Sequence, residues 1–292
     1  MNTLLERLDH YEKLMRLDKP IGILLLLWPT LWALWLSSWG TPNWAAVWIF
    51  GLGTVVMRSA GCVLNDVADR KFDPHVERTK NRPIAAGKVS VKEALYLFAA
   101  LVLCAFCLVL TLENRYVVAL SVPALLLTVS YPFTKRFFAV PQAYLGLAYG
   151  FGIPMAYAVQ FDTIPLTAWT LLLANVFWAM AYDTEYAMVD RADDLRIGIR
   201  TSAIAFGRFD VAAVMFCYAA AFALIAWVGC EMRAHWEFYA GLGVAAALAV
   251  YHYFLIRRRE PARCFKAFLH NNWIGASIFA GIVVDFMARG TH

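Results

Sequence analysis

The sequence predicts an all-α integral membrane protein of about nine transmembrane helices, and composition and residue spacing carry this prediction. Apolar residues make up 61% of the 292 positions and charged residues 16%, and the mean hydropathy is +0.58. Soluble domains are roughly 45–50% apolar and about 25% charged. Because a soluble fold could not bury this much apolar side chain, we expect lipid to cover part of it.

Nine apolar runs are long enough to cross a bilayer, which requires roughly twenty mainly apolar residues. They lie near residues 20–39, 44–69, 91–112, 116–132, 141–160, 165–189, 209–229, 236–256 and 268–288. Pro29, Pro123 and Pro154 fall inside these runs. They are expected to kink the helices, which a packed bundle tolerates.

The basic residues indicate the orientation, because cytoplasmic loops carry an excess of Lys and Arg. Of the 26 basic residues, 22 fall in the N-terminal arm or in the loops after the even-numbered runs, and three fall on the other side. The N-terminus is therefore predicted to be cytoplasmic and the C-terminus to lie outside. The net charge of +5 then reflects basic loops that lie next to the lipid bilayer. It indicates no nucleic-acid partner.

The chain is predicted to be one membrane domain over residues 1–292. Residues 1–19 form a cytoplasmic arm in which Leu5, Leu8 and Met15 recur near helical spacing, so we expect an interfacial helix. Two four-helix repeats, about 20–135 and about 136–256, and a ninth helix at about 268–288 are expected to surround a central cavity.

A cluster of acidic residues follows the second run. Asn65, Asp69 and Asp73 are spaced at i, i+4 and i+8, so a helix would place them on one stripe, with Asp66 beside it. Acidic residues at a helix end can simply mark the water boundary. That interpretation fits poorly here, because carboxylates are unfavourable at a helix C-terminus and repel one another on a shared stripe.

The same spacing recurs after the sixth run, in a second cluster made of Asp183, Tyr186, Asp190 and Asp194. Gly87 follows Asp69 by 18 residues, and Gly207 follows Asp190 by 17. This internal repeat places the two clusters symmetrically across the predicted cavity, at the cytoplasmic face. Oxygen ligands in this number favour Mg²⁺, which prefers a few carboxylates together with phosphate oxygens. The sequence therefore predicts a magnesium site for a phosphorylated substrate.

Cations suited to a diphosphate accompany the clusters. Lys135 and Arg136 follow Tyr131 in a short cytoplasmic loop, and Arg82 and Arg200 follow the two clusters. Lys135 and Arg136 could equally be topology anchors. Arg58 lies within the membrane and requires an anionic partner, either a nearby Asp or a substrate carboxylate.

These motifs resemble those of the UbiA-type intramembrane aromatic prenyltransferases. The shared signatures are N-D-x-x-D-x-x-x-D at 65–73, D-x-x-x-D at 190–194 and Y-x-x-x-K at 131–135. Within that family the chain is most similar to the bacterial 4-hydroxybenzoate polyprenyltransferases of ubiquinone biosynthesis. The segments that indicate this branch are 14–22, 57–62, 141–155 and 182–190.

The resemblance implies a role for each candidate residue. Expected Mg²⁺ ligands are Asn65, Asp66, Asp69, Asp73, Asp183, Asp190 and Asp194. Expected substrate-binding residues are Arg16, Arg58, Arg82, Lys135, Arg136, Tyr186 and Arg200. Expected catalytic residues are Tyr131, Lys135, Asp190 and Asp194, and either of these two aspartates could orient the phenol or accept its proton.

The implied reaction joins a polyprenyl group, supplied as its diphosphate, to the carbon ortho to the hydroxyl of 4-hydroxybenzoate. It would take place near the cytoplasmic face of a bacterial inner membrane. Another aromatic acceptor is the main alternative. A secondary transporter fits less well, because transporters gather intramembrane charge near the midplane. The sequence indicates no protein partner, oligomeric state or preferred prenyl chain length.

Overall fold

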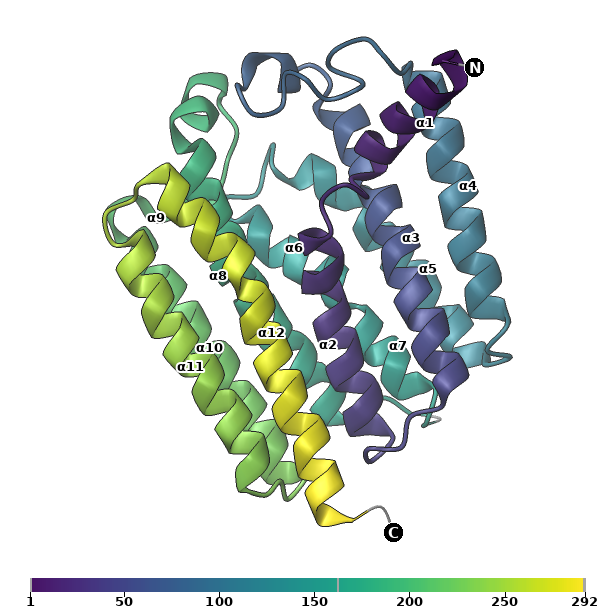
Figure 1. The fold of residues 1–292 in the computed structure, drawn as a ribbon, viewed down its shortest axis with the longest axis vertical. Helices are drawn as coiled ribbons and strands as arrows, with labels where there is room; N and C mark the ends of the chain where they lie inside the picture. The colour runs from purple at the N-terminus through teal and green to yellow at the C-terminus, as the bar shows by residue number, and fades with distance from the viewer. Residues whose placement is uncertain (1, 162, 291–292) are drawn as a thin grey trace.

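The structure is a computed structural model that describes residues 2–161 and 163–290, and these residues form helices and turns with no strand among them. The long helices form a bundle with α1 (Asn2–Met15) at one end and the last turn of α12 (Pro261–Arg289) at the other (Figure 1). The predicted all-α fold class is confirmed.

Helical structure occupies all nine predicted runs. The helices are α2 (Ile21–Ser37), α3 (Trp44–Asp69), α4 (Val91–Leu110), α5 (Arg115–Thr134), α6 (Pro141–Gly150), α7 (Gly152–Ala158), α8 (Leu166–Ile197), α10 (Asp210–Glu231), α11 (Trp236–Ile256) and α12. Shorter pieces are α9 (Ser202–Phe206), η1 (Asp73–His75) and η2 (Gly207–Phe209).

Six helical stretches in the described part of the chain are long and apolar enough to span a bilayer: α3, α4, α5, α9 to α10, α11 and α12. The protein is therefore an integral membrane protein. The number of nine spans and the repeat boundaries stay predictions, because α2 is short and the sixth run carries charge.

Local sequence explains where the helices begin and end. The Asn43 side chain accepts a hydrogen bond from the Ala45 N–H at 2.8 Å and begins α3. Ser90 and Glu93 form a capping box at the start of α4. Gly198 ends α8 with a φ of 71°, a left-handed conformation that glycine adopts without strain.

The fifth run departs from its prediction as one continuous helix. It breaks at Phe151 into α6 and α7. Pro154 accounts for the break, because it lacks the N–H that a continuous helix would donate to the Gly150 carbonyl. Pro29 and Pro123, in contrast, lie inside helices that continue through them.

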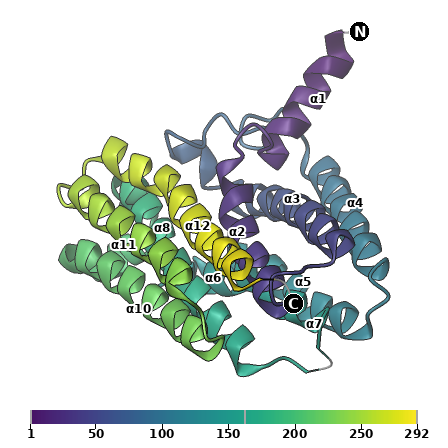
Figure 2. The same ribbon diagram turned by 60° about the horizontal axis from the view of Figure 1, so that its bottom comes forward.

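The helices form two groups that meet along α2 and α6. Figures 1 and 2 show α3, α4, α5 and α7 on one side and α8, α10, α11 and α12 on the other. Between them Trp32 of α2 and Trp178 of α8 lie with ring centroids 5.2 Å apart and fill the core. Only 11% of the most apolar stretch of α4 is buried, so α4 presents most of its surface to lipid.

The amphipathic arm has one exposed and one buried face. Leu4, Leu5 and Leu8 of α1 are exposed, whereas Leu14 is fully buried in a cluster with Val63. The arrangement suits a helix that lies in the membrane interface.

Candidate active site

A cavity of about 970 Å³ lies where the C-terminal parts of α3 and α8 approach the α1 end of the bundle. Both acidic clusters contribute to its wall. The predicted residues that line it are Asn65, Asp69, Asp73, Asp183, Asp190, Asp194, Arg16, Arg58, Arg82, Tyr131, Lys135 and Tyr186. The structure thus brings together residues that are more than a hundred positions apart in the sequence.

The first cluster comes from two different elements. Asn65 and Asp69 lie on one face of the last turns of α3, as their spacing predicts. Asp73 is not on that helix, contrary to the predicted three-residue stripe, and lies in η1. Pro74 accounts for this, because it has no N–H to donate to the Arg70 carbonyl and so prevents α3 from continuing through this segment. The turn nevertheless buries Asp73 and directs it into the cavity.

Three cations neutralise the first cluster. Lys135 Nζ lies 3.0 Å from Asn65 Oδ1 and 3.0 Å from Asp69 Oδ2. Arg82 Nη1 lies 3.0 Å from Asp73 Oδ2 and 3.1 Å from Asp66 Oδ1, and Arg16 Nη2 donates to the same Asp66 oxygen at 2.6 Å. These cations therefore lie where an anionic ligand could replace the carboxylates as their partners.

The second cluster lies entirely on α8 and has fewer cations. Arg78, from the segment after η1, pairs with Asp190 through two nitrogens, with Nε 3.0 Å from both carboxylate oxygens. Its guanidinium also lies 4.5 Å from the centre of the Tyr186 ring. Asp183 and Asp194 have no ion pair with the described cations. Tyr186 in turn packs on Phe268, with centroids 4.6 Å apart.

Three predicted residues do not line the cavity. Asp66 is buried beneath Arg16 and Arg82 and holds them in place. Arg136 donates to the Ala68 carbonyl, and Arg200 donates to the Phe137 carbonyl. Because these backbone contacts occupy both arginines away from the cavity, the structure places neither as a diphosphate clamp.

Arg58 is almost fully buried in the cavity wall. It donates to the Met15 carbonyl at 3.4 Å and to the Cys62 sulfur. Asp66 and Asp69 pair with other cations, and no carboxylate among residues 2–161 and 163–290 pairs with Arg58. Of the two partners considered for this charge, the structural aspartate is therefore contradicted.

Sequence reasoning missed several residues of this region. Arg78 belongs to the basic loop after the second run, and only the fold brings it to Asp190 of the second cluster. Glu185 is fully buried and accepts hydrogen bonds from Tyr218 at 3.0 Å and Asn271 at 2.8 Å. This network ties α8 to α10 and α12 and fixes which face of α8 meets the cavity. For Glu185, the one available signal in the sequence is an acidic residue near the end of an apolar run.

The residue types and the electrostatics of the cavity suit a divalent cation. Burial raises the pKa of Asp73 above its usual value despite its ion pair with Arg82, and the charges on Asp66 and Asp69 add to the increase. An added cation would offset that repulsion. Carboxylate and amide oxygens are also the donors that Mg²⁺ prefers, so the residues present fit the predicted metal.

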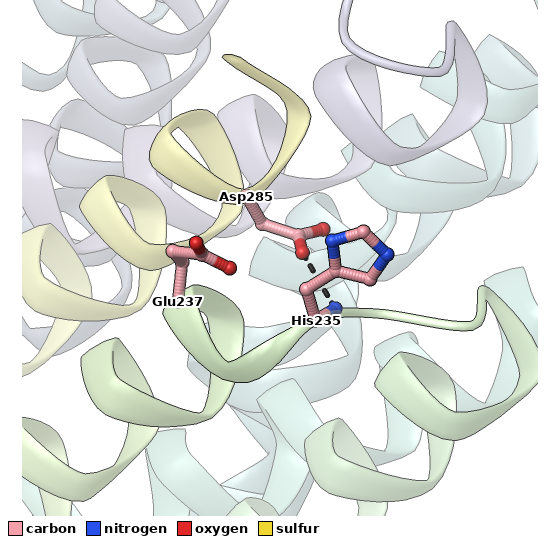
Figure 3. Close-up of side chains that lie close together, drawn as sticks. All are labelled: His235, Glu237 and Asp285. Carbon is pink, nitrogen blue, oxygen red and sulfur yellow. Dashed lines mark hydrogen bonds between the residues drawn. The ribbon is translucent and has the colours of Figure 1, made fainter. Parts of the chain in front are cut away.

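Another group of metal-ligand side chains lies near the opposite end of the bundle. Figure 3 shows His235, Glu237 and Asp285, whose ligand atoms lie within 4.8 Å of one another. Asp285 accepts the His235 N–H at 2.7 Å and pairs with Arg289. Through these contacts Asp285 links the start of α11 to α12. The charge of Arg289 balances the charge of its carboxylate.

The helices and the cavity define a polytopic membrane protein with a cavity lined by carboxylates and basic side chains at one end of the bundle. The chain belongs to the UbiA prenyltransferase family, whose model matches residues 26–274. The resemblance inferred from the aspartate motifs is therefore confirmed.

Similar proteins cover the whole chain. It is 68% identical over 290 residues to the 4-hydroxybenzoate octaprenyltransferase of Dechloromonas aromatica (strain RCB). The aligned residues make up 99% of this chain and 98% of the relative. The enzyme of that name from Thiobacillus denitrificans (strain ATCC 25259 / T1) is 67% identical and covers 98% of each chain.

Solved structures share the fold. A UbiA homolog from Aeropyrum pernix K1 superposes with a TM-score of 0.79 at 26% identity and covers 90% of this chain and 97% of the homolog. A UbiA homolog from Archaeoglobus fulgidus bound to GPP and Mg2+ has a TM-score of 0.67 at 18% identity and covers 94% of this chain and 99% of that homolog.

Proposed function

We propose that the protein transfers a polyprenyl group from a polyprenyl diphosphate to 4-hydroxybenzoate, in a step of ubiquinone biosynthesis. The observation that carries this proposal is the single cavity in which carboxylates of both halves meet basic side chains and an aromatic wall. The relatives' name supports the acceptor and an octaprenyl donor. A transporter is not favoured, because the carboxylates gather at one end of the bundle.

Magnesium is the proposed cofactor. Asn65, Asp69 and Asp73 would hold it on the α3 side, and Asp183, Asp190 and Asp194 on the α8 side. When bound, Mg²⁺ supplies positive charge next to the diphosphate leaving group. Asp66, which does not line the cavity, instead positions Arg16 and Arg82.

The basic side chains bind the diphosphate. Lys135 and Arg82 would exchange part of their carboxylate contacts for phosphate oxygens, as charge-assisted hydrogen bonds permit. The allylic C–O bond then breaks, and its electron pair leaves with the diphosphate. Tyr131 lies in the same wall, with its ring centre 5.7 Å from Lys135 Nζ, and offers an aromatic face to the allylic cation.

The aromatic acid attacks the cation through the carbon ortho to its hydroxyl. A carbon–carbon bond forms, and loss of the ring proton restores aromaticity. Asp190 or Asp194 accepts that proton or orients the phenol. Arg58 binds the acid's carboxylate, because it is a buried cation without a carboxylate partner in the described chain. Tyr186 and Phe268 form an apolar surface for the ring.

A reconstituted assay tests the proposal. Vesicles that contain the purified protein, Mg²⁺ and octaprenyl diphosphate are supplied with a panel of aromatic acids. We expect 4-hydroxybenzoate to be prenylated ortho to its hydroxyl and turnover to stop with EDTA and return with Mg²⁺. A preference for another acid would mean that 4-hydroxybenzoate is not the acceptor. Activity that survives EDTA would remove the metal from the mechanism.

We also propose that the protein lies in the bacterial inner membrane with the N-terminus and the active site at the cytoplasmic face. The basic loops and the carboxylates lie at the same end of the bundle as α1, which supports this orientation. Reporter fusions after Arg136 and at the C-terminus should give opposite signals. Identical signals would overturn the nine-span topology.

A further inference from the structure

Arg58 lies where three helices meet at the wall of the cavity. It belongs to α3, and its guanidinium reaches Met15 at the end of α1 and Gly22 in the first turn of α2. The Met15 carbonyl is one of the last in its helix, where no following N–H of that helix can reach it. Arg58 Nη1 donates to this oxygen at 3.4 Å and to the sulfur of Cys62, one turn further along α3. Protein acceptors therefore hold one nitrogen of the guanidinium.

The other two nitrogens of Arg58 have no protein acceptor. Among residues 2–161 and 163–290, no oxygen or sulfur accepts a hydrogen bond from Nε or Nη2. Neither nitrogen is among the fully buried polar atoms that lack a partner, so both reach the cavity that Arg58 lines. Together they form an edge of the guanidinium that can bind a carboxylate through two parallel hydrogen bonds.

Gly22 makes room for this edge of the guanidinium. A Cβ atom built at Gly22 would lie 2.5 Å from Arg58 Nε, about as close to Nη2, and 2.8 Å from Cζ. These separations are too short for real Cβ contacts, so any other residue at position 22 would displace the guanidinium. Because the two nitrogens lie closer than Cζ, the added atom would cover the same edge that has no protein acceptor. The close approach of α2 to Arg58 therefore requires a glycine at this position.

We infer that Gly22 and Cys62 position Arg58 to bind the carboxylate of the aromatic acceptor. The inference rests on the proposed function and adds what fixes the orientation of the acid-binding residue. Cys62 holds Nη1, and Gly22 leaves the Nε and Nη2 edge uncovered at the cavity wall. A long arginine side chain loses conformational entropy when it is fixed. Holding it before the acid arrives reduces the part of this cost that falls on binding.

The first test compares Gly22→Ala with Gly51→Ala in vesicles. Both substitutions replace a helical glycine with alanine. Gly51 lies on α3 and does not line the cavity, and a Cβ atom built there meets no other atom within 4 Å. Gly22→Ala should raise the KM for 4-hydroxybenzoate about tenfold, with kcat and the KM for the diphosphate nearly unchanged. Gly51→Ala should change none of these constants.

A double-mutant cycle tests whether Gly22 acts through Arg58. In a protein that already carries Arg58→Lys, Gly22→Ala should raise the KM for 4-hydroxybenzoate less than about twofold further, because the guanidinium that the methyl group displaces is absent. Cys62→Ala should raise the same KM about threefold. Cys62→Ser should restore it, because a hydroxyl oxygen can also accept from Nη1. If Gly22→Ala does not fold, the two Cys62 variants decide.

The outcomes separate this inference from the proposed function. If the guanidinium only linked the three helices, Gly22→Ala would lower the melting temperature and leave the KM for 4-hydroxybenzoate unchanged, and the inference alone would fail. Fully additive effects of Gly22→Ala and Arg58→Lys, or equal rises in the KM of both substrates, would also overturn it. A wild-type protein that prenylates no aromatic acid would overturn the proposed function itself, and the positioning role with it.

Discussion

The two acidic clusters have the same spacing in sequence but different surroundings in the structure. On the α3 side, Arg16, Arg82 and Lys135 contact four polar or acidic side chains. On the α8 side, Arg78 alone pairs with Asp190. The first cluster is therefore nearly neutralised, whereas the second keeps carboxylates without a basic partner in the described part of the chain.

This difference suggests how the proposed reaction is divided. A carboxylate that accepts a proton must be free of strong ion pairs, and Asp194 meets that condition. Cations that release a carboxylate in favour of a diphosphate must lie close to it, and Lys135 and Arg82 do. The α3 side is suited to the donor's diphosphate, and the α8 side, with its aromatic wall, is suited to the acceptor.

The largest expected effect comes from removing one charge in each cluster. Asp69→Asn and Asp190→Asn should each lower kcat about a thousandfold. Each removes an anionic ligand of the proposed Mg²⁺, whose positive charge stabilises the departing diphosphate. Mg²⁺ with diphosphate should raise the melting temperature of the wild type by a few degrees, roughly as linkage predicts. Asp69→Asn should lose this shift.

Asp193→Asn is the matched control for both variants. Asp193 is adjacent to the second cluster, but it lines no cavity and pairs only with the exposed Arg196 at 3.6 Å. Its kcat should match that of the wild type. A comparable loss in this control would show that net charge at the membrane face, rather than the two clusters, determines turnover.

The clusters also show how far sequence alone could go. Helical spacing correctly joined Asn65 to Asp69 and Asp190 to Asp194, because those pairs lie on continuous helices. It failed at Asp73, where a turn before a proline replaces the helix. Spacing is a local property, so it predicts a face and not what packs against that face.

Which cation meets which carboxylate depended on tertiary structure. Arg136 and Arg200 resembled diphosphate clamps by position, yet both donate to backbone carbonyls. Arg78 and Asp190 are 112 residues apart, and no local pattern relates them.

Arg58→Lys gives an intermediate effect and tests the assignment of the acceptor. Lysine keeps the charge but cannot offer a two-pronged contact to a carboxylate. The KM for 4-hydroxybenzoate should rise about tenfold, which corresponds to roughly 1.4 kcal/mol, whereas the KM for the diphosphate should change little. Steady-state kinetics with each substrate varied in turn measures both constants.

The opposite result for Arg58 would assign this residue to the diphosphate donor rather than to the acceptor. If the diphosphate KM and the Mg²⁺ requirement change while the acid's KM does not, Arg58 serves the α3 cluster. An enzyme with both constants unchanged would remove Arg58 from substrate binding altogether.

Arg78→Lys should give the smallest effect, because this residue contacts the second cluster near the surface. Its side chain is 35% exposed, and an ion pair with that much solvent contributes little. Lysine would keep the charge near Asp190 but lose the two-nitrogen contact and the stacking on Tyr186. We expect the KM for the diphosphate to rise less than about fivefold, with kcat nearly unchanged.

The control for Arg78 is Lys80→Ala, since Lys80 lies in the same segment and pairs only with the exposed Glu77. It should match the wild type in both constants. A rise in the acid's KM in Arg78→Lys would contradict this expectation and would place Arg78 with the acceptor, like the rest of the α8 side. A rise confined to the diphosphate would mean that the donor is bound from both sides, with Asp190 contributing to its anchoring and Asp194 left as the carboxylate free to accept the ring proton.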